Sequence, residues 1–117
     1  MAFYLYIREN KYWNIENIYK ISITKNIAES HSQYIKNELE AGSFIIIFEI
    51  YELDMNFFDN NFKDFFIKYN YFINAGKEFY YKNIIPNIIK YLYQKGIKYR
   101  MLSNDEIETN QSFSIIY

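Results

Sequence analysis

The sequence predicts an α+β fold in which a three-stranded, mainly antiparallel sheet is flanked by helices. Two observations predict it: two short tyrosine-rich segments alternate like the strands of a hairpin, and helix-like stretches begin at capping residues. The chain has 117 residues, which is room for one modest core, so we expect a single domain over residues 1–117. A C-terminal helix and an extended segment complete the expected architecture.

The N-terminal hairpin is predicted from two alternating segments and the polar stretch between them. Residues 2–8 alternate and are rich in aromatic side chains, and residues 18–24 alternate apolar with polar side chains. The polar residues 9–17 are then the hairpin loop. A third strand is expected over residues 43–53, where a continuous apolar centre indicates burial on both faces of the sheet.

Two helices are predicted from capping residues and helical spacing. Asn26 and Glu29 form a capping-box pattern, so a first helix is expected over residues 26–40. Asp54 is the predicted N-cap of a second helix that reaches residue 70. Aromatic residues recur along it at helical spacing, which indicates a core stripe rather than a ligand site. These residues are Phe58, Phe62, Phe65, Phe66 and Tyr69.

Turn residues divide the rest of the chain. A turn at Asn74–Gly76 precedes a short aromatic segment at residues 78–81, and a third helix is expected over residues 83–95 with Gly96 as its C-cap. Its inward side chains are expected to be Ile84, Ile85, Ile88, Ile89 and Leu92. The remaining elements are an extended segment at 97–102, a short helix from Ser103, and a closing strand or tail at 112–117.

Composition excludes several classes of site. The chain has no cysteine, so it can form neither a disulfide nor a thiolate metal centre. Its single histidine, His31, excludes a multi-histidine zinc site and is expected to be an exposed helix residue. The formal net charge of −1 lacks the basic excess that is usual for a protein holding duplex DNA through its phosphates.

Charge is nevertheless uneven along the chain. Between residues 77 and 100 a run of cationic residues faces a single acidic residue, Glu78, whereas residues 42–70 are mainly acidic. The basic run is a candidate binding patch, and the alternative is that both segments are solvated faces. The candidate binding residues are Lys77, Lys82, Lys90, Lys95, Lys98 and Arg100.

Localisation is predicted from absent targeting features. The N-terminus shows no basic start with an apolar run, and the longest wholly apolar run, residues 44–48, is too short for a membrane span. We therefore expect a soluble intracellular protein with no membrane partner. Heavy use of Ile, Asn, Lys, Tyr and Phe indicates AT-rich coding DNA, and so a large DNA virus or an AT-rich microbe. A viral protein would act in the host cytoplasm or the virion.

Segments in order along the chain resemble the GIY-YIG nuclease superfamily, most of all its branch in phages and giant DNA viruses, which includes a small domain preceding some viral helicases. Tyr6 takes the position of the tyrosine in the first motif. Residues 20–24 read Lys-Ile-Ser-Ile-Thr where the second motif reads Lys-Ile-Gly-x-Thr, which places Lys20 and Ser22 at motif positions. The resemblance implies a hairpin-and-helix nuclease scaffold.

The later motifs of the family also have counterparts. The segment that normally carries an arginine and, one turn later, a tyrosine or histidine here has Ser30 and Tyr34. Asp59 falls where the metal-binding glutamate is expected. Residues 76–80 resemble the Gly-x-Glu-Phe-Phe that follows, and residues 97–103 resemble the end of the viral version. The likeness therefore covers nearly the whole chain.

The departures from the family pattern affect its chemistry. The resemblance implies a general base, a cation on the phosphate, a carboxylate for a divalent metal, and a glycine that lets the DNA backbone approach. Here Ser30 replaces the cation, Ser22 replaces the glycine, and Asp59 is one methylene shorter than glutamate. Loss of one transition-state cation costs on the order of 10²–10³-fold in rate. We therefore expect the scaffold without the nuclease and without a cofactor.

Three hypotheses follow. The leading one is a catalytically degenerate GIY-YIG-like binding module, a viral accessory protein that docks on a protein partner or on nucleic acid. The first alternative is an active endonuclease that uses Tyr6 or Lys20 as base, Asp59 for Mg²⁺ or Mn²⁺, and an arginine from elsewhere, Arg8 or Arg100. The second alternative is a structural protein that forms oligomers.

Each candidate residue also has a simpler interpretation. Tyr6 can be a strand aromatic, Lys20 a surface lysine, and Asp59 a solvated residue on the polar side of its helix. Glu78 can cap a turn. The decisive observation is whether Tyr6, Lys20 and Asp59 converge on one cleft with a cation near Ser30.

Overall fold

The computed structural model describes residues 2–51, 53–71 and 78–116, and it shows an α+β fold built on one antiparallel sheet. The predicted turn at Asn74–Gly76 and the candidate residue Lys77 lie outside these residues. The sheet has the strand order β4-β2-β1-β3-β5. Its strands are β1 (Phe3–Glu9), β2 (Ile18–Thr24), β3 (Ser43–Ile50), β4 (Phe79–Tyr81) and β5 (Tyr99–Met101).

The sheet has five strands in the described part of the chain, so the predicted number of three was too low. The expected hairpin and third strand form its middle, with Tyr6 opposite Ser22 on β2 and opposite Ile47 on β3. The two added strands are three residues each, too short for an alternating pattern to reveal them. They are strands because β4 pairs with β2 and β5 pairs with β3.

The hairpin loop contains a short helix that was not predicted, α1 (Lys11–Ile15). Asn10 caps it, because its side-chain oxygen accepts a hydrogen bond from the backbone N–H of Trp13 at 3.0 Å. Asn17 then adopts a φ of 59°, a left-handed conformation that asparagine tolerates, and the chain turns into β2. The prediction of a plain loop over residues 9–17 was therefore wrong.

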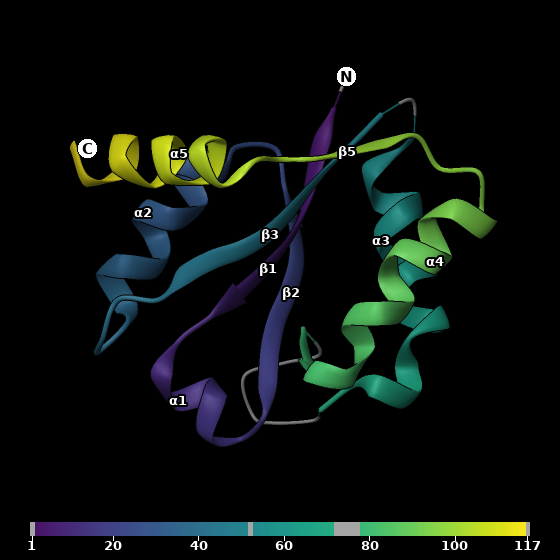
Figure 1. Cartoon of the computed structure of the whole chain (residues 1–117), viewed down its shortest axis with the longest axis horizontal. Helices are drawn as coiled ribbons and strands as arrows, with labels where there is room; N and C mark the ends of the chain where they lie inside the picture. The colour runs from purple at the N-terminus through teal and green to yellow at the C-terminus, as the bar shows by residue number, and fades with distance from the viewer. Residues whose placement is uncertain (1, 52, 72–77, 117) are drawn as a thin grey trace.

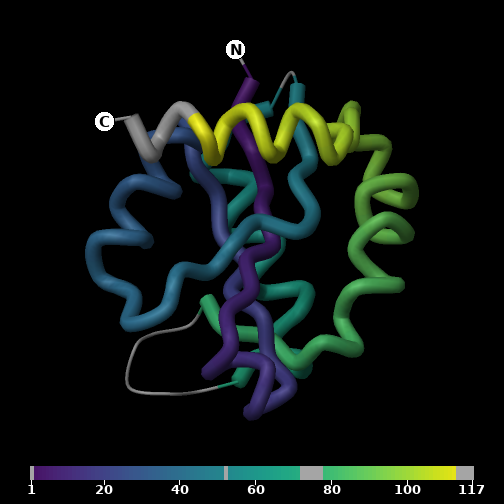
Figure 2. Tube along the Cα trace, turned by 60° about the vertical axis from the view of Figure 1, so that its left-hand side comes forward, coloured from purple at the N-terminus to yellow at the C-terminus, as the bar shows by residue number. Residues whose placement is uncertain are grey.

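Helices cover both faces of the sheet (Figure 1). One face, here called the Tyr6 face, is covered by α2 (Ile27–Asn37) and α5 (Asn104–Ile116). The opposite face, the Leu5 face, is covered by α3 (Met55–Phe65) and α4 (Ile85–Gln94). Figure 2 shows the strands running between α2 on one side and α4 on the other, with α5 crossing above them.

Alternation along the strands divides the core between these faces. Phe3, Leu5 and Ile7 of β1 join a cluster with the buried phenylalanines of α3 and the isoleucines of α4. Tyr6 points the other way and packs with Phe44 and with residues of α2 and α5. The predicted inward residues Ile84, Ile88 and Leu92 are buried, but Ile89 is 42% exposed and Tyr91 is buried instead. Phe65 of the predicted core stripe is 51% exposed.

Three further predictions need correction. α2 ends at Asn37 rather than near residue 40, because Glu38 leaves the helical conformation and its side chain is held by buried Arg8. His31 is buried, not exposed, since α2 turns it toward β1 and β3. The last helix runs on to residue 116, where a closing strand or tail was expected. Its predicted capping box at Ser103 is confirmed by reciprocal hydrogen bonds with Glu106.

None of the helices within the described residues combines the length and the apolar character that crossing a bilayer requires.

Candidate functional site

Four of the sequence-predicted site residues line one open cleft on the Tyr6 face. The register of the hairpin places Tyr6 opposite Ser22 and Arg8 opposite Lys20, so the side chains of these two cross-strand pairs lie on one face of the sheet. α2 lies over this face and brings Ser30 and Tyr34 to it. The cleft has a volume of about 630 Å³. Its lining residues are Tyr6, Trp13, Lys20, Ile23, Thr24, Ser30, Gln33, Tyr34, Asn37 and Glu38.

A pair of hydrogen-bonded tyrosines forms the floor of the cleft. The hydroxyl oxygens of Tyr6 and Tyr34 are 2.7 Å apart, and their rings meet edge to face. Burial raises the pKa of Tyr6 above its ordinary value. Burial, together with the neighbouring Tyr6 hydroxyl, raises the pKa of Tyr34 far above its ordinary value. Both side chains are therefore neutral phenols near pH 7, and neither is poised to lose a proton to the cleft.

Arg8 is the nearest guanidinium to the cleft, and it is fully buried. Its Nη2 and Nε donate to the two carboxylate oxygens of Glu38 at 2.7 and 3.2 Å. Its Nη1 lies 2.9 Å from Nδ1 of His31. The guanidinium also lies 4.5 Å from the ring centroid of Tyr34 and 4.8 Å from that of Phe44. Arg8 thus makes its hydrogen bonds inside the protein, so it is not available as the arginine that the active-endonuclease hypothesis requires.

The contact with Arg8 also indicates the protonation state and tautomer of His31. A guanidinium has only donors, so Nδ1 of His31 accepts this hydrogen bond and the imidazole is neutral with its proton on Nε2. Burial and the charge of Arg8 lower the pKa of His31, in agreement with that state. For Glu38, burial acts to raise the pKa, but hydrogen bonds from Arg8 and from the backbone N–H of Gly42 bring it below its ordinary value. The resulting pair is an ionised carboxylate and a guanidinium.

The carboxylate at the centre of the hairpin comes from Glu78, not from Asp59. Ser22 Oγ donates a hydrogen bond to Glu78 Oε2, and Lys20 Nζ lies 3.8 Å from Glu78 Oε1. Asp59 lies on α3, which covers the Leu5 face, and there it forms an ion pair with Lys63 at 3.0 Å. The structure therefore does not bring Asp59 together with Tyr6 and Lys20. The other interpretation of Glu78, that it caps a turn, concerns the turn at Asn74–Gly76, which lies outside the described residues.

Ser30, which the sequence resemblance places at an arginine position, makes an uncharged contact. Ser30 Oγ donates to Thr24 Oγ1 at 2.7 Å, which ties α2 to the end of β2. Among the described residues that line the cleft, Lys20 is the only lysine, and its Nζ lies 5.0 Å from the ring centroid of Tyr34 and 5.5 Å from that of Phe79. The cleft is thus aromatic and polar with nearly balanced charge.

The residues present do not suit a divalent cation. Among the described residues, no group of three or more His, Asp or Glu side chains is placed to hold a metal ion. A cation at Glu78 would meet the ammonium of Lys20, 3.8 Å from the same carboxylate. In the described part of the chain every buried side-chain nitrogen and oxygen has a hydrogen-bond partner, so no orphaned ligand atom marks a site either.

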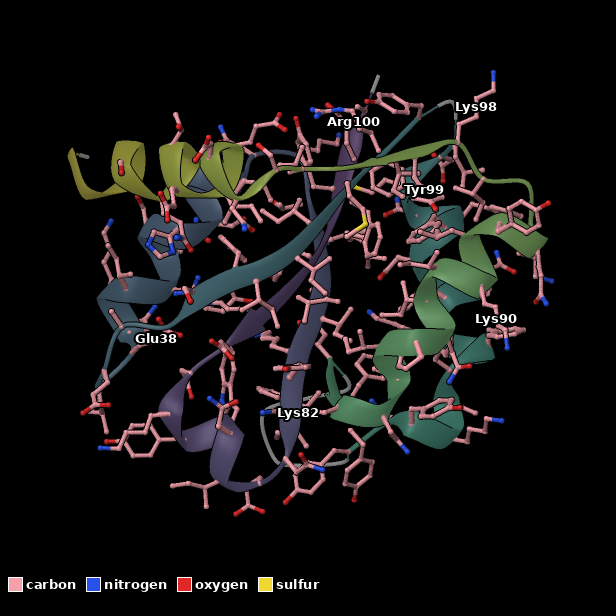
Figure 3. All side chains as sticks on the ribbon, in the orientation of Figure 1. Glu38, Lys82, Lys90, Lys98, Tyr99 and Arg100 are labelled. Carbon is pink, nitrogen blue, oxygen red and sulfur yellow. The ribbon has the colours of Figure 1, made fainter. Side chains whose placement is uncertain are left out.

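The predicted basic run does not form one patch. Figure 3 shows Lys82 at the lower end of the sheet, Lys90 on α4, and Lys98 and Arg100 at the upper end. Lys82 donates to Asn14 at 2.7 Å. Arg100 is held by Glu49 and Glu106, with its Nη1 2.8 Å from Glu106 Oε1. This placement also removes Arg100 from the cleft.

Sequence reasoning missed the Arg8–Glu38–His31 network and the role of Glu78. One signal was available: Arg8 follows Tyr4 and Tyr6 in strand alternation, so it had to enter the same half-buried face. A buried guanidinium requires a carboxylate partner, and the partner is 30 residues away in the chain.

Comparison of the chain with models of protein families, with curated proteins and with solved structures finds no match.

Proposed function

We propose that this protein is a catalytically degenerate, GIY-YIG-like binding module, whose cleft recognises a protein partner instead of cleaving DNA. One observation carries the proposal: the charged groups around the cleft are already paired within the protein, Arg8 with Glu38 and Lys20 with Glu78. A phosphodiester entering the cleft would find no free guanidinium to stabilise its developing charge.

The remaining groups support the same proposal. The two phenols are held neutral by burial, so they are poor general bases. The side chains lining the cleft offer aromatic surface, from Trp13 and the tyrosines, and uncharged amides and hydroxyls, from Gln33, Asn37 and Thr24. Such a surface can bind a partner through packing and hydrogen bonds, but it offers little positive charge to phosphate groups. Tyrosine supplies large contact area at low entropic cost. A protein segment suits it better than nucleic acid.

The cellular setting is part of the proposal. The residue usage supports an accessory protein of an AT-rich DNA virus that works inside the host cell, without a metal cofactor. Nucleic acid is the second choice of partner, because Lys20 is the one cationic side chain that lines the cleft within residues 2–51, 53–71 and 78–116.

A plasmid assay tests the absence of nuclease activity. Supercoiled plasmid is incubated with the protein and Mg²⁺ or Mn²⁺, and we expect no nicking above a protein-free control. The matched variants are Glu78→Gln, at the ion-pair partner of the cleft residue Lys20, and Asp59→Ala, on the opposite face of the sheet. Robust nicking that is lost in Glu78→Gln and retained in Asp59→Ala would overturn the proposal.

Trp13 provides the binding assay, because it is the only tryptophan of the chain and it lines the cleft. Its emission is followed during titration with single-stranded and duplex oligonucleotides at low and moderate salt. We expect little change. A strong, salt-sensitive change that is lost in Lys20→Met would favour a nucleic-acid partner over a protein partner.

An active endonuclease remains the second candidate, because Glu78 and Lys20 form an ion pair and Glu78 also contacts Ser22, which lies opposite Tyr6 on the hairpin. In that case Lys20 would have to leave Glu78 before it could act as a base or as the phosphate-binding cation. Nicking that is abolished by both Lys20→Met and Glu78→Gln would favour this candidate.

A further inference from the structure

A second surface of the molecule combines exposed aromatic side chains with lysines, and it lies on the α3–α4 side, away from the cleft. Phe57 is 61% exposed and Phe65 is 51% exposed, although both belong to the helix whose other phenylalanines form the core. Phe57 lies two turns before Phe65 and within about 80° of it around the helix axis. The two rings therefore share one side of α3 and leave apolar area in water.

Phe65 lies at the seam between the two helices. Its ring centroid is 4.7 Å from that of Tyr91 on α4, and the Nζ of Lys95 is 5.6 Å from the Phe65 ring. Further along, the side-chain amide of Asn87 donates to the hydroxyl of Tyr69 at 2.9 Å. These contacts join α3 and α4 into one surface. The α3–α4 seam is defined here by Phe57, Phe65, Lys68, Lys90 and Lys95.

The lysines of the seam are electrostatically unbalanced. Lys68, Lys90 and Lys95 have no carboxylate within ion-pair distance among residues 2–51, 53–71 and 78–116, whereas Lys20 and Lys63 do. Figure 3 shows Lys90 on α4, remote from Glu38 and Arg100. Two exposed carboxylates lie close to this side, Asp64 on α3 and Asp54 at its N-cap, where Asp54 accepts a hydrogen bond from the backbone N–H of Phe57. The three lysines therefore outnumber the carboxylates by one, and the positive charge lies at the Phe65 end of the seam, where Lys95 contacts the ring.

We propose that the α3–α4 seam docks an acidic amphipathic helix of a partner protein. The rings would bury their exposed area against the apolar side of such a helix, and its carboxylates would neutralise the lysines. A nucleic-acid duplex could neutralise the lysines, but its bases are stacked on one another and would give the phenylalanines little apolar contact. A single strand could stack its bases on the rings, so tighter binding of a single-stranded oligonucleotide than of the acidic peptide would overturn the proposal. The seam is on the opposite side of the sheet from the cleft, and this proposal stands independently of what the cleft binds.

Binding is tested with the full chain and two labelled helical peptides of about 15 residues, or four turns. One peptide has leucines at positions i, i+3, i+4 and i+7 with glutamates elsewhere, and the other has lysines in place of the glutamates. Fluorescence anisotropy gives the dissociation constants. We expect the acidic peptide to bind and the basic peptide to bind at least about tenfold more weakly, as charge complementarity requires.

Variants on and off the seam locate the binding. Phe57→Ser and the double variant Lys90→Glu/Lys95→Glu should each weaken the acidic peptide by about tenfold or more, the effect of losing one interface anchor. Leu39→Ser, at a side chain 89% exposed after α2, and Lys36→Glu are the matched apolar and charge controls, and they should leave binding unchanged. Phe57 makes no ring contact with another aromatic residue in the described part of the chain, and thermal unfolding checks that each variant remains folded.

Three further results would overturn the proposal. Equal binding of the two peptides would remove the charge argument. Equal loss in the control variants would show that the contact is non-specific. Co-sedimentation with phosphatidylcholine–phosphatidylserine vesicles, lost in Lys90→Glu/Lys95→Glu, would assign the surface to a membrane instead. None of these results depends on the plasmid assay, so the two proposals fail separately.

Discussion

Replacing Arg8 by alanine should destabilise the fold more than any other charge deletion in the described structure. Arg8 has no exposed surface, and the Glu38 side chain is 8% exposed. Alanine would leave the Glu38 carboxylate buried with hydrogen bonds from Gly42 and Asn10 but with no cation beside it. It would also leave Nδ1 of His31 without its donor.

The size of the effect follows from this geometry. Removing one partner of a buried ion pair costs about 3–5 kcal/mol, because the remaining charge is desolvated and uncompensated. At roughly 4 °C per kcal/mol for a domain of this length, the thermal midpoint should fall by about 12–20 °C. Arg8→Lys should lie between wild type and alanine, since it keeps the charge but loses the two-pronged contact with Glu38 and the packing on Tyr34.

Urea unfolding followed by far-UV circular dichroism measures the loss, and an unchanged m-value confirms that the transitions are comparable. Arg100→Ala is the matched control, because Arg100 also makes a two-pronged contact with a carboxylate, that of Glu106, at 2.8 and 2.9 Å. That guanidinium is 48% exposed, so water screens the pair and a far smaller loss is expected. If Arg8→Ala and Arg100→Ala shifted the midpoint equally, the reasoning from burial would be refuted.

Three further predictions concern the same junction. The free energy of unfolding should fall as the pH drops below about 6.5, because the unfolded chain binds a proton at His31 more readily than the folded chain does. Urea titrations at several pH values measure this loss, and His31→Gln should remove the part that begins near pH 6.5. An identical pH dependence in wild type and His31→Gln would contradict the prediction. Gly42→Ala should lower stability by about 1–3 kcal/mol, since a Cβ there would clash with the backbone carbonyl oxygen of Glu9; an unchanged urea midpoint would show that the backbone shifts to relieve the clash. Tyr34→Phe should cost about 1 kcal/mol by removing the partner of the Tyr6 hydroxyl, and a gain in stability would mean that this contact is strained.

Local patterns in the sequence predicted the long elements well. Alternation located β1 and β2, and capping residues located the starts of α2 and α3, where the side chains of Asn26 and Asp54 accept backbone hydrogen bonds as expected. The edge strand β5 lies within the segment predicted to be extended, but neither β5 nor β4 was predicted as a strand of the sheet, because three residues carry no usable period. They exist as strands only because β2 and β3 offer them backbone partners.

The candidate site also contains residues that local sequence patterns bring together and contacts that those patterns do not indicate. Tyr6, Lys20 and Ser22 reach one face because strand alternation within seven-residue segments decides it, and helical spacing adds Tyr34. Glu78 reaches Ser22 across 56 residues, and nothing local in either segment indicates that contact. Asp59 was assigned to the site from its position in the sequence, but which face of the sheet α3 covers depends on the packing of the whole domain.

The sequence by itself determined where most of the helices and strands lie and which side chains each presents together, because hydrophobic period and capping act between residues a few positions apart. Tertiary structure alone decided how the charges are used. Whether Arg8 is free to bind a ligand or is paired with Glu38 depends on the burial of its guanidinium, and α2 and β3 bury that group by packing beside β1. The chemistry available to the cleft was settled by that closure.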